Sequence, residues 1–139
     1  MLPVSTRGRY AARILVYLAS LGQENVATKR EIAASEGISP DYVEQIMIRL
    51  KTAGLVRSHR GRRGGFSLAV APQRLSMARV LEATEGVVSP APCLRNNACR
   101  RASRCPTRPV WQRAAHALDT VFEETTIADL VTRPEEPKA

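Results

Sequence analysis

The chain has 139 residues, of which 44% are hydrophobic and only 4% aromatic, so one domain with a mainly aliphatic core is expected. Its formal net charge of +8 favours a polyanionic partner, without distinguishing DNA from RNA or a membrane surface. No apolar run reaches the roughly 18 residues of a membrane span. The first four residues lack the features of a signal peptide. We therefore expect a cytoplasmic protein with no membrane partner.

Two helices are predicted near the start of the chain. Apolar residues at helical spacing indicate a first helix over about residues 6–21, which Gly22 ends. A second, shorter helix follows Thr28, because Thr28 and Glu31 have the types and spacing of a capping box. Gly37 ends this second helix.

A third helix begins at Ser39-Pro40, since serine is a good N-cap and proline suits the first helical position. Only a short turn separates it from the second helix, which is the spacing of a helix-turn-helix with the third helix as recognition helix. Its outward face is predicted to carry polar side chains, namely Asp41, Tyr42, Glu44, Gln45, Arg49 and Thr52. Tyrosine, glutamine and arginine can contact base edges or phosphates. A helical hairpin of an ordinary bundle is the alternative.

A basic hairpin is predicted directly after this unit. Residues 55–58 and 66–69 are expected as two strands, and the connection between them is rich in glycine and arginine. Glycines permit a tight turn, while Arg60, Arg62 and Arg63 crowd its tip. An arginine at such a tip can enter a narrow minor groove, so the hairpin is interpreted as a wing. The alternative, a flexible basic loop, is the weaker one directly after a helix-turn-helix.

All three cysteines fall in one proline-containing segment, residues 87–109, which follows a fourth helix predicted over about residues 76–84. Cys93, Cys99 and Cys105 are each separated by five residues. A disulfide framework is not expected in a cytoplasmic chain. Thiolates suit zinc or an iron–sulfur cluster, but both normally need four ligands. The spacing itself leaves metal binding and three unrelated reduced thiols open.

A last long helix is predicted over about residues 109–124. Its apolar stripe consists of Trp111, Ala114, Ala115, Leu118, Val121 and Phe122. A second copy can cover this stripe in a two-fold dimer, and packing onto its own domain is the alternative. We thus expect a mainly α fold, with a winged helix-turn-helix domain in residues 1–75 and a helix with the cysteine loop in 76–108. A dimerisation helix and C-terminal segment follow in 109–132, and a disordered tail in 133–139.

Together these motifs resemble the IscR, NsrR and CymR group of bacterial transcription regulators over about residues 4–131. The resemblance is carried by residues 5–11, 31–33, 38–45, 53–56, 60–61, 64–66 and 105–107, and by Trp111. It implies a winged-helix homodimer that binds double-stranded operator DNA through residues similar to the group's DNA contacts, namely Ser39, Tyr42, Glu44, Gln45 and Arg60. With neighbouring polar and basic residues, the expected DNA-binding set is Thr28, Ser39, Tyr42, Glu44, Gln45, Arg49, Arg60, Arg62 and Arg63.

The same resemblance implies an iron–sulfur cluster, 2Fe-2S or 4Fe-4S, on Cys93, Cys99 and Cys105, whose state alters DNA affinity. IscR-like members carry a fourth ligand, a histidine, three residues after the last cysteine, where this chain has Arg108. NsrR-like members use a carboxylate early in the first helix of the partner chain, and residues 7–10 contain none. The fourth ligand and the cluster type therefore stay open.

Two other functions are weighed against a cluster-dependent regulator. A cluster-free regulator of the same fold, which senses oxidants or a small molecule through its thiols, is the main alternative. An enzyme with a cysteine nucleophile is not expected, because neither His59 nor His116 has a recognisable triad around it. His59 is expected to be structural or exposed, and His116 to be exposed.

Overall fold

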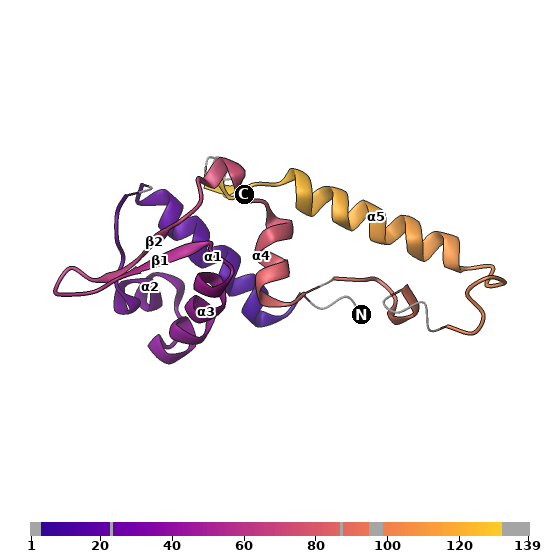
Figure 1. The fold of residues 1–139 in the computed structure, drawn as a ribbon, viewed down its shortest axis with the longest axis horizontal. Helices are drawn as coiled ribbons and strands as arrows, with labels where there is room; N and C mark the ends of the chain where they lie inside the picture. Colours follow the sequence, from indigo (N-terminus) through magenta and orange to yellow (C-terminus); the bar gives the residue numbers. More distant parts are fainter. Residues whose placement is uncertain (1–3, 23, 87, 95–98, 132–139) are drawn as a thin grey trace, which may run out of the picture.

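A computed structural model describes residues 4–22, 24–86, 88–94 and 99–131, which form a helical head and a long protruding arm (Figure 1). The main elements are α1 (Thr6–Ser20), α2 (Lys29–Glu36), α3 (Pro40–Thr52), β1 (Val56–His59), β2 (Gly65–Leu68), α4 (Met77–Thr84), α5 (Arg108–Glu124) and α6 (Ile127–Val131). Two 3₁₀ turns, η1 (Pro72–Arg74) and η2 (Pro92–Leu94), lie in the connections. No helix in the described ranges is long and apolar enough to cross a membrane. The tail predicted for residues 133–139 lies outside the described residues.

The predicted caps form in the structure. The Thr28 hydroxyl accepts a hydrogen bond from the Glu31 amide, and the Glu31 carboxylate accepts one from the Thr28 amide, both at 3.1 Å. The Ser39 hydroxyl accepts from the Tyr42 amide at 3.2 Å, and Pro40 is the first residue of α3. These bonds satisfy backbone donors that a helix N-terminus otherwise leaves unpaired, which is why the helices begin at these residues.

One aliphatic core holds the head together. Each helix of the head contributes side chains that are almost completely buried, among them Ile14, Leu18, Ile32, Val43, Ile46, Met47, Leu50, Val80 and Ile127. The predicted stripe on α3 is thus confirmed as its buried face. Because α1, α3, α4 and α6 share this core, the position of the recognition helix depends on the whole head.

Each strand of the hairpin lies one residue nearer the turn than predicted. β1 and β2 are antiparallel, with Val56 opposite Leu68 and His59 opposite Gly65. The Gly64 amide donates to the Gly61 carbonyl at 2.9 Å, which closes the turn early and lets pairing continue to His59. At the other end, the Leu55 amide donates to the Leu50 carbonyl at 2.9 Å and completes the C-terminal cap of α3, while the Leu55 carbonyl accepts from the Ala69 amide at 3.0 Å.

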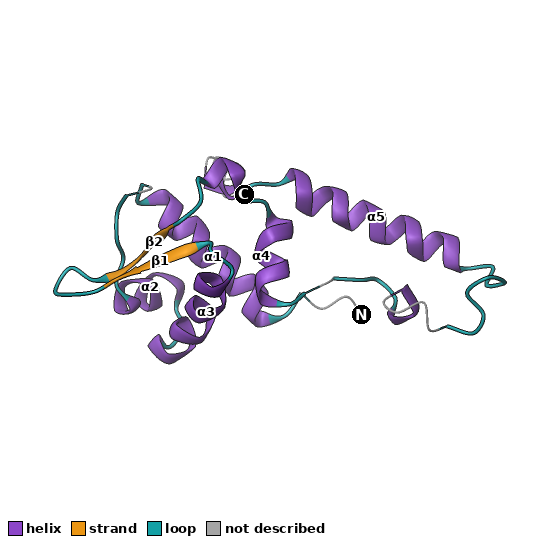
Figure 2. Cartoon of the chain, viewed as in Figure 1, coloured by secondary structure: helices purple, strands orange, loops and turns teal. Residues whose placement is uncertain are grey.

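The C-terminal part contains one helix that the sequence pattern does not predict. α6 has five residues, too few for a periodic signal, yet Thr126 and Asp129 cap each other's amides at its start. The Ile127 amide donates to the Leu75 carbonyl at 2.8 Å and the side chain is fully buried. α6 thereby returns the chain to the head after α5. α5 itself lies at the opposite end of the molecule from the tip of the β1–β2 hairpin (Figure 2).

Candidate DNA-binding surface and cysteine loop

The turn between α2 and α3 has the tight geometry of a helix-turn-helix. Gly37 adopts a left-handed conformation with φ of 67°, which glycine tolerates without strain. The amides of Gly37 and Ile38 both donate to the Ala33 carbonyl, at 2.9 and 3.2 Å, and complete the C-cap of α2. The chain reverses within three residues, so α3 packs directly against α2.

The outward face of α3 is solvent-exposed at most of the predicted positions. Ser39, Glu44, Gln45 and Arg49 are exposed, and the Glu44 carboxylate lies 3.3 Å from the ammonium of Lys29 on α2. Both partners of this ion pair are exposed, so it contributes little to stability. Its effect is to neutralise part of the negative charge on the predicted DNA-reading face.

Ile48 is a member of this face that the sequence pattern does not single out. Its side chain is 60% exposed, although isoleucine is normally buried. Residue 48 follows Glu44 and Gln45 by four and three positions, so the three side chains lie on one side of α3. Only the exposed fraction reveals Ile48, because the sequence shows an isoleucine beside the buried Met47.

Tyr42 lies differently from the prediction, which put it on the outer face of α3. Its side chain is only partly exposed and packs against the core. The ring meets Tyr10 of α1 edge-on, with 5.9 Å between ring centroids and 86° between planes. Edge-to-face packing is a favoured arrangement of two aromatic rings, and it draws Tyr42 towards α1.

The wing carries its basic residues at an exposed tip. Arg60, Arg62 and Arg63 are all exposed, and Gly61 has a φ of 101° that favours glycine. At the base of the wing, His59 is exposed and its Nε2 lies 2.8 Å from Ser67 Oγ on the paired strand. Both expectations for His59 are met, since it is exposed and braces the hairpin.

The base of the wing is tied to the start of the helix-turn-helix. The Ala27 amide donates to the Phe66 carbonyl at 2.9 Å, and the Phe66 amide donates to the Ala27 carbonyl at 2.8 Å. Ala27 immediately precedes Thr28, the N-cap of α2. At Gly65 a Cβ atom would collide with the Ala27 backbone, so only glycine allows this approach. These two hydrogen bonds therefore fix the position of the hairpin relative to the start of α2.

The cysteine loop connects α4 with α5. Cys93 lies in η2, Cys105 lies three residues before α5, and all three thiols are free and partly exposed. No group of three Cys, His, Asp or Glu side chains within the described ranges is arranged to hold a metal ion. Three thiols match the donor chemistry of an iron–sulfur cluster, but they are not gathered here, and among the described residues no fourth ligand joins them.

Arg108, at the position of the absent histidine, closes the loop instead. Its Nη1 donates to the Cys93 carbonyl at 3.4 Å, joining the first cysteine to the first residue of α5. Cys105 lies beside this junction, and its Sγ is 3.3 Å from Thr107 Oγ1. The hydrogen bonds from Thr107 and the nearby Arg108 lower the pKa of the Cys105 thiol.

α5 leaves much of its apolar stripe uncovered. The helix has no fully buried residue, and Val110, Trp111 and Val121 are 49%, 41% and 57% exposed. Its C-terminal half packs against α4, where Phe122 and Leu81 line an open hollow. His116 is exposed, as predicted. Several large apolar side chains on one helix are unusual on the surface of a monomer.

A helix-turn-helix joined directly to a basic hairpin defines a winged-helix DNA-binding protein, which confirms the predicted fold class. The family model described as iron-dependent transcriptional regulator, Rrf2, matches residues 4–133. The chain therefore belongs to the Rrf2 family of transcription regulators, as its resemblance to IscR, NsrR and CymR predicts. This is a family of regulators and not of enzymes.

Individual relatives agree with this assignment. The protein Rrf2 of Nitratidesulfovibrio vulgaris is 34% identical over 129 residues, covering 92% of this chain and 86% of the relative. The structure of CymR, the global cysteine regulator of Bacillus subtilis, has a TM-score of 0.83 at 32% identity, covering 97% of this chain and 100% of that one. The structure of T. potens IscR has a TM-score of 0.76 at 29% identity, covering 94% and 86%.

Proposed function

We propose that this chain is a homodimeric regulator that binds double-stranded operator DNA in the cytoplasm and responds to the state of its cysteine loop. The observation that carries the DNA-binding part is the hydrogen-bonded tie between Ala27 and Phe66, which couples the wing to α2. Two exposed DNA-reading elements on one rigid unit can contact adjacent grooves together. Rigid coupling also reduces the ordering cost of binding.

The proposed contacts divide by chemistry. Thr28 and Ser39 stand at helix N-termini, where hydroxyls and amides suit phosphate oxygens. Glu44, Gln45 and Arg49 on α3 are proposed to read base edges or anchor the backbone, with Tyr42 at the edge of that face. Arg60, Arg62 and Arg63 are proposed to contact the minor groove or its phosphates.

Ile48 adds an apolar contact to this set. An exposed aliphatic side chain beside Gln45 is suited to the methyl group of thymine in the major groove. Ile48→Ala is therefore expected to relax the preference for thymine at one position of each half-site. Selection of bound sequences from a random DNA library, compared with wild type, measures this change directly.

The proposed dimer is formed by the apolar stripe of α5. The exposed Val110, Trp111 and Val121 support this interface, because a second copy would remove them from water. A two-fold dimer places two recognition helices about one DNA turn apart, roughly 34 Å, and matches a palindromic site. The operator is expected to be an inverted repeat.

The regulatory site is proposed to be the loop that carries Cys93, Cys99 and Cys105. These thiolates would hold an iron–sulfur cluster, with a fourth ligand that the chain does not identify. Such a cluster would give the loop a redox-active group that oxygen can oxidise and that is lost when iron is scarce. The loop joins α4 of the head to α5, and Arg108 ties Cys93 to the start of α5, so a change in loop conformation can reposition α5 relative to the head.

A cluster-free thiol sensor is the second candidate. It is favoured by the absence, within the described ranges, of three side chains arranged to hold a metal ion. It is also supported by the similarity to CymR, a cysteine regulator. Both candidates use the same DNA-binding surface and dimer.

Anaerobic reconstitution separates the two candidates. The cluster hypothesis predicts a coloured protein with stoichiometric iron and sulfide, and each single substitution Cys93→Ala, Cys99→Ala or Cys105→Ala is expected to abolish both while leaving the dimer folded. A colourless wild-type protein without iron, whose DNA affinity changes with a thiol oxidant, would establish the second candidate instead. The cysteine variants then lose the oxidant response.

A further inference from the structure

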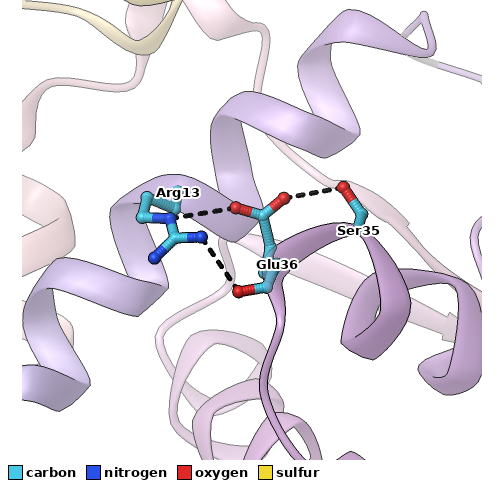
Figure 3. A network of polar contacts seen from close by, with 3 residues as sticks. All are labelled: Arg13, Ser35 and Glu36. Carbon is cyan, nitrogen blue, oxygen red and sulfur yellow. Dashed lines mark hydrogen bonds and ion pairs between the residues drawn. The ribbon is translucent and has the colours of Figure 1, made fainter.

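One arginine of α1 contacts the end of α2. The Arg13 Nε lies 3.1 Å from Glu36 Oε1, and its Nη2 donates to the Glu36 carbonyl oxygen at 2.9 Å (Figure 3). The second carboxylate oxygen of Glu36 accepts a hydrogen bond from Ser35 at 2.7 Å. Glu36 is the last residue of α2, and its side chain is only 12% exposed. Arg13 therefore satisfies a terminal carbonyl and places a cation at the negative end of the helix dipole.

The same arginine is connected to the start of α3. Its guanidinium carbon lies 5.1 Å from the centroid of the Tyr10 ring, within the range of a cation–π contact. The Tyr10 ring in turn meets Tyr42, in the first turn of α3, edge-on. One side chain thus acts on both helices that flank Gly37 and Ile38.

We propose that Arg13 is a positioning residue for DNA recognition, which holds both ends of the turn between α2 and α3 and so fixes the angle at which α3 meets DNA. Arg13 itself joins α1 to Glu36, 23 positions further along the chain, and the Tyr10 ring that it faces joins α1 to Tyr42. These contacts do not read the DNA sequence themselves, but they hold α3, the helix proposed to read it, in its binding orientation. The proposal rests on the proposed function, since it assigns a role in operator binding.

The distinction from a direct DNA contact is measurable. An arginine that binds phosphate contributes to the dependence of affinity on salt, and its loss lowers that slope by about 1. A positioning arginine leaves the slope unchanged and lowers affinity for the specific site alone. Lysine keeps the charge for a phosphate contact, but it lacks the rigid fork that reaches the carboxylate and the carbonyl together.

The test uses full-length dimer and the duplex that wild-type protein selects from a random library, with a scrambled duplex for nonspecific binding. Arg13→Gln is compared with Arg9→Gln, which removes the same charge from an exposed residue of α1 whose hydrogen bond goes to Thr6 of its own helix. We expect Arg13→Gln to weaken binding to the selected duplex about fivefold more than Arg9→Gln does, as for the loss of a partly exposed ion pair. Binding to the scrambled duplex and the salt slope should match the control.

Arg13→Lys should show the same loss as Arg13→Gln, and the double variant with Glu36→Gln should lose no more than Arg13→Gln alone. If Arg13→Gln does not fold, as judged by circular dichroism, Arg13→Lys and Glu36→Gln carry the same comparison. Equal affinities for Arg13→Gln and Arg9→Gln, or a lowered slope that lysine restores, would overturn the proposal. Failure of wild-type protein to select any sequence would instead refute the proposed function.

Discussion

Replacing Gly8 by alanine is expected to destabilise this protein, although alanine is the better helix former. Gly8 lies in the first turn of α1, beside Glu85, which caps α4. One oxygen of the Glu85 carboxylate accepts hydrogen bonds from the Ser5 amide at 2.5 Å and the Ser5 hydroxyl at 2.7 Å. A Cβ atom on residue 8 would collide with that carboxylate. The missing side chain of Gly8 leaves room for the Glu85 carboxylate to reach Ser5.

The magnitude follows from two opposing effects. Alanine in place of glycine stabilises a helix by about 0.5–1 kcal/mol. The collision involves the end of a flexible side chain, so Glu85 can turn away, but it then loses both bonds to Ser5. Hydrogen bonds to charged groups contribute roughly 1.5–3 kcal/mol each, and because this pair is only partly buried we expect a loss of about 2–3 kcal/mol in total. The net destabilisation is then about 1–2.5 kcal/mol.

Urea unfolding at one fixed protein concentration measures this effect, with Gly8→Ala made in two backgrounds. In the wild-type background the substitution should lower the free energy of unfolding. In a Glu85→Ala background, where no carboxylate remains to collide, the same substitution should raise it by the helix contribution alone. An effect of the same sign and size in both backgrounds would refute the reasoning, because residues 8 and 85 would then be uncoupled.

Three further substitutions test other parts of the molecule. Arg60→Ala should weaken operator binding, with the salt slope reduced by about 1 if the residue contacts phosphate, or a loss of about 1–3 kcal/mol if it contacts a base. Binding as tight as wild type at every salt concentration would contradict the wing assignment. Leu118→Asp should give a monomer by analytical ultracentrifugation, because it places an unpaired charge in the proposed α5 interface; a wild-type monomer at micromolar concentration would contradict that interface. Gly65→Ala should reduce amide exchange protection at Ala27 and Phe66, since the new Cβ meets the Ala27 backbone; unchanged protection would show that the tie does not need glycine.

Much of the DNA-binding unit follows from the sequence because its signals are local. The capping box of Thr28 and Glu31 acts over three residues, and Ser39-Pro40 defines the start of α3 in the same way. The buried stripe of α3 repeats every three or four positions, which one segment of chain displays by itself. The arginine-rich connection between two short apolar segments likewise predicts the wing, although each strand lies one residue nearer the turn than predicted.

The cysteine loop marks a limit of local signals. The sequence predicts that Cys93, Cys99 and Cys105 share one loop, and they do. Whether their thiols converge depends on the path of the backbone between them, which regular helical or strand hydrogen bonds do not specify. In the structure Arg108 donates a hydrogen bond to the Cys93 carbonyl, 15 residues earlier, and the spacing of the cysteines does not predict this contact.

Only the tertiary structure decides which side chains of distant segments meet. Tyr42 occupies a position that helical periodicity assigns to the outer face, yet Tyr10 draws its ring towards α1. Arg13 reaches Glu36 for the same reason, because the shared core sets the distance between α1 and α2. The longer helices and the turns depend on residues three or four apart, so the sequence alone determined those elements, whereas the five-residue α6 appears only in the structure. Contacts between elements depend on how the buried faces pack, and therefore appear only once the chain is folded.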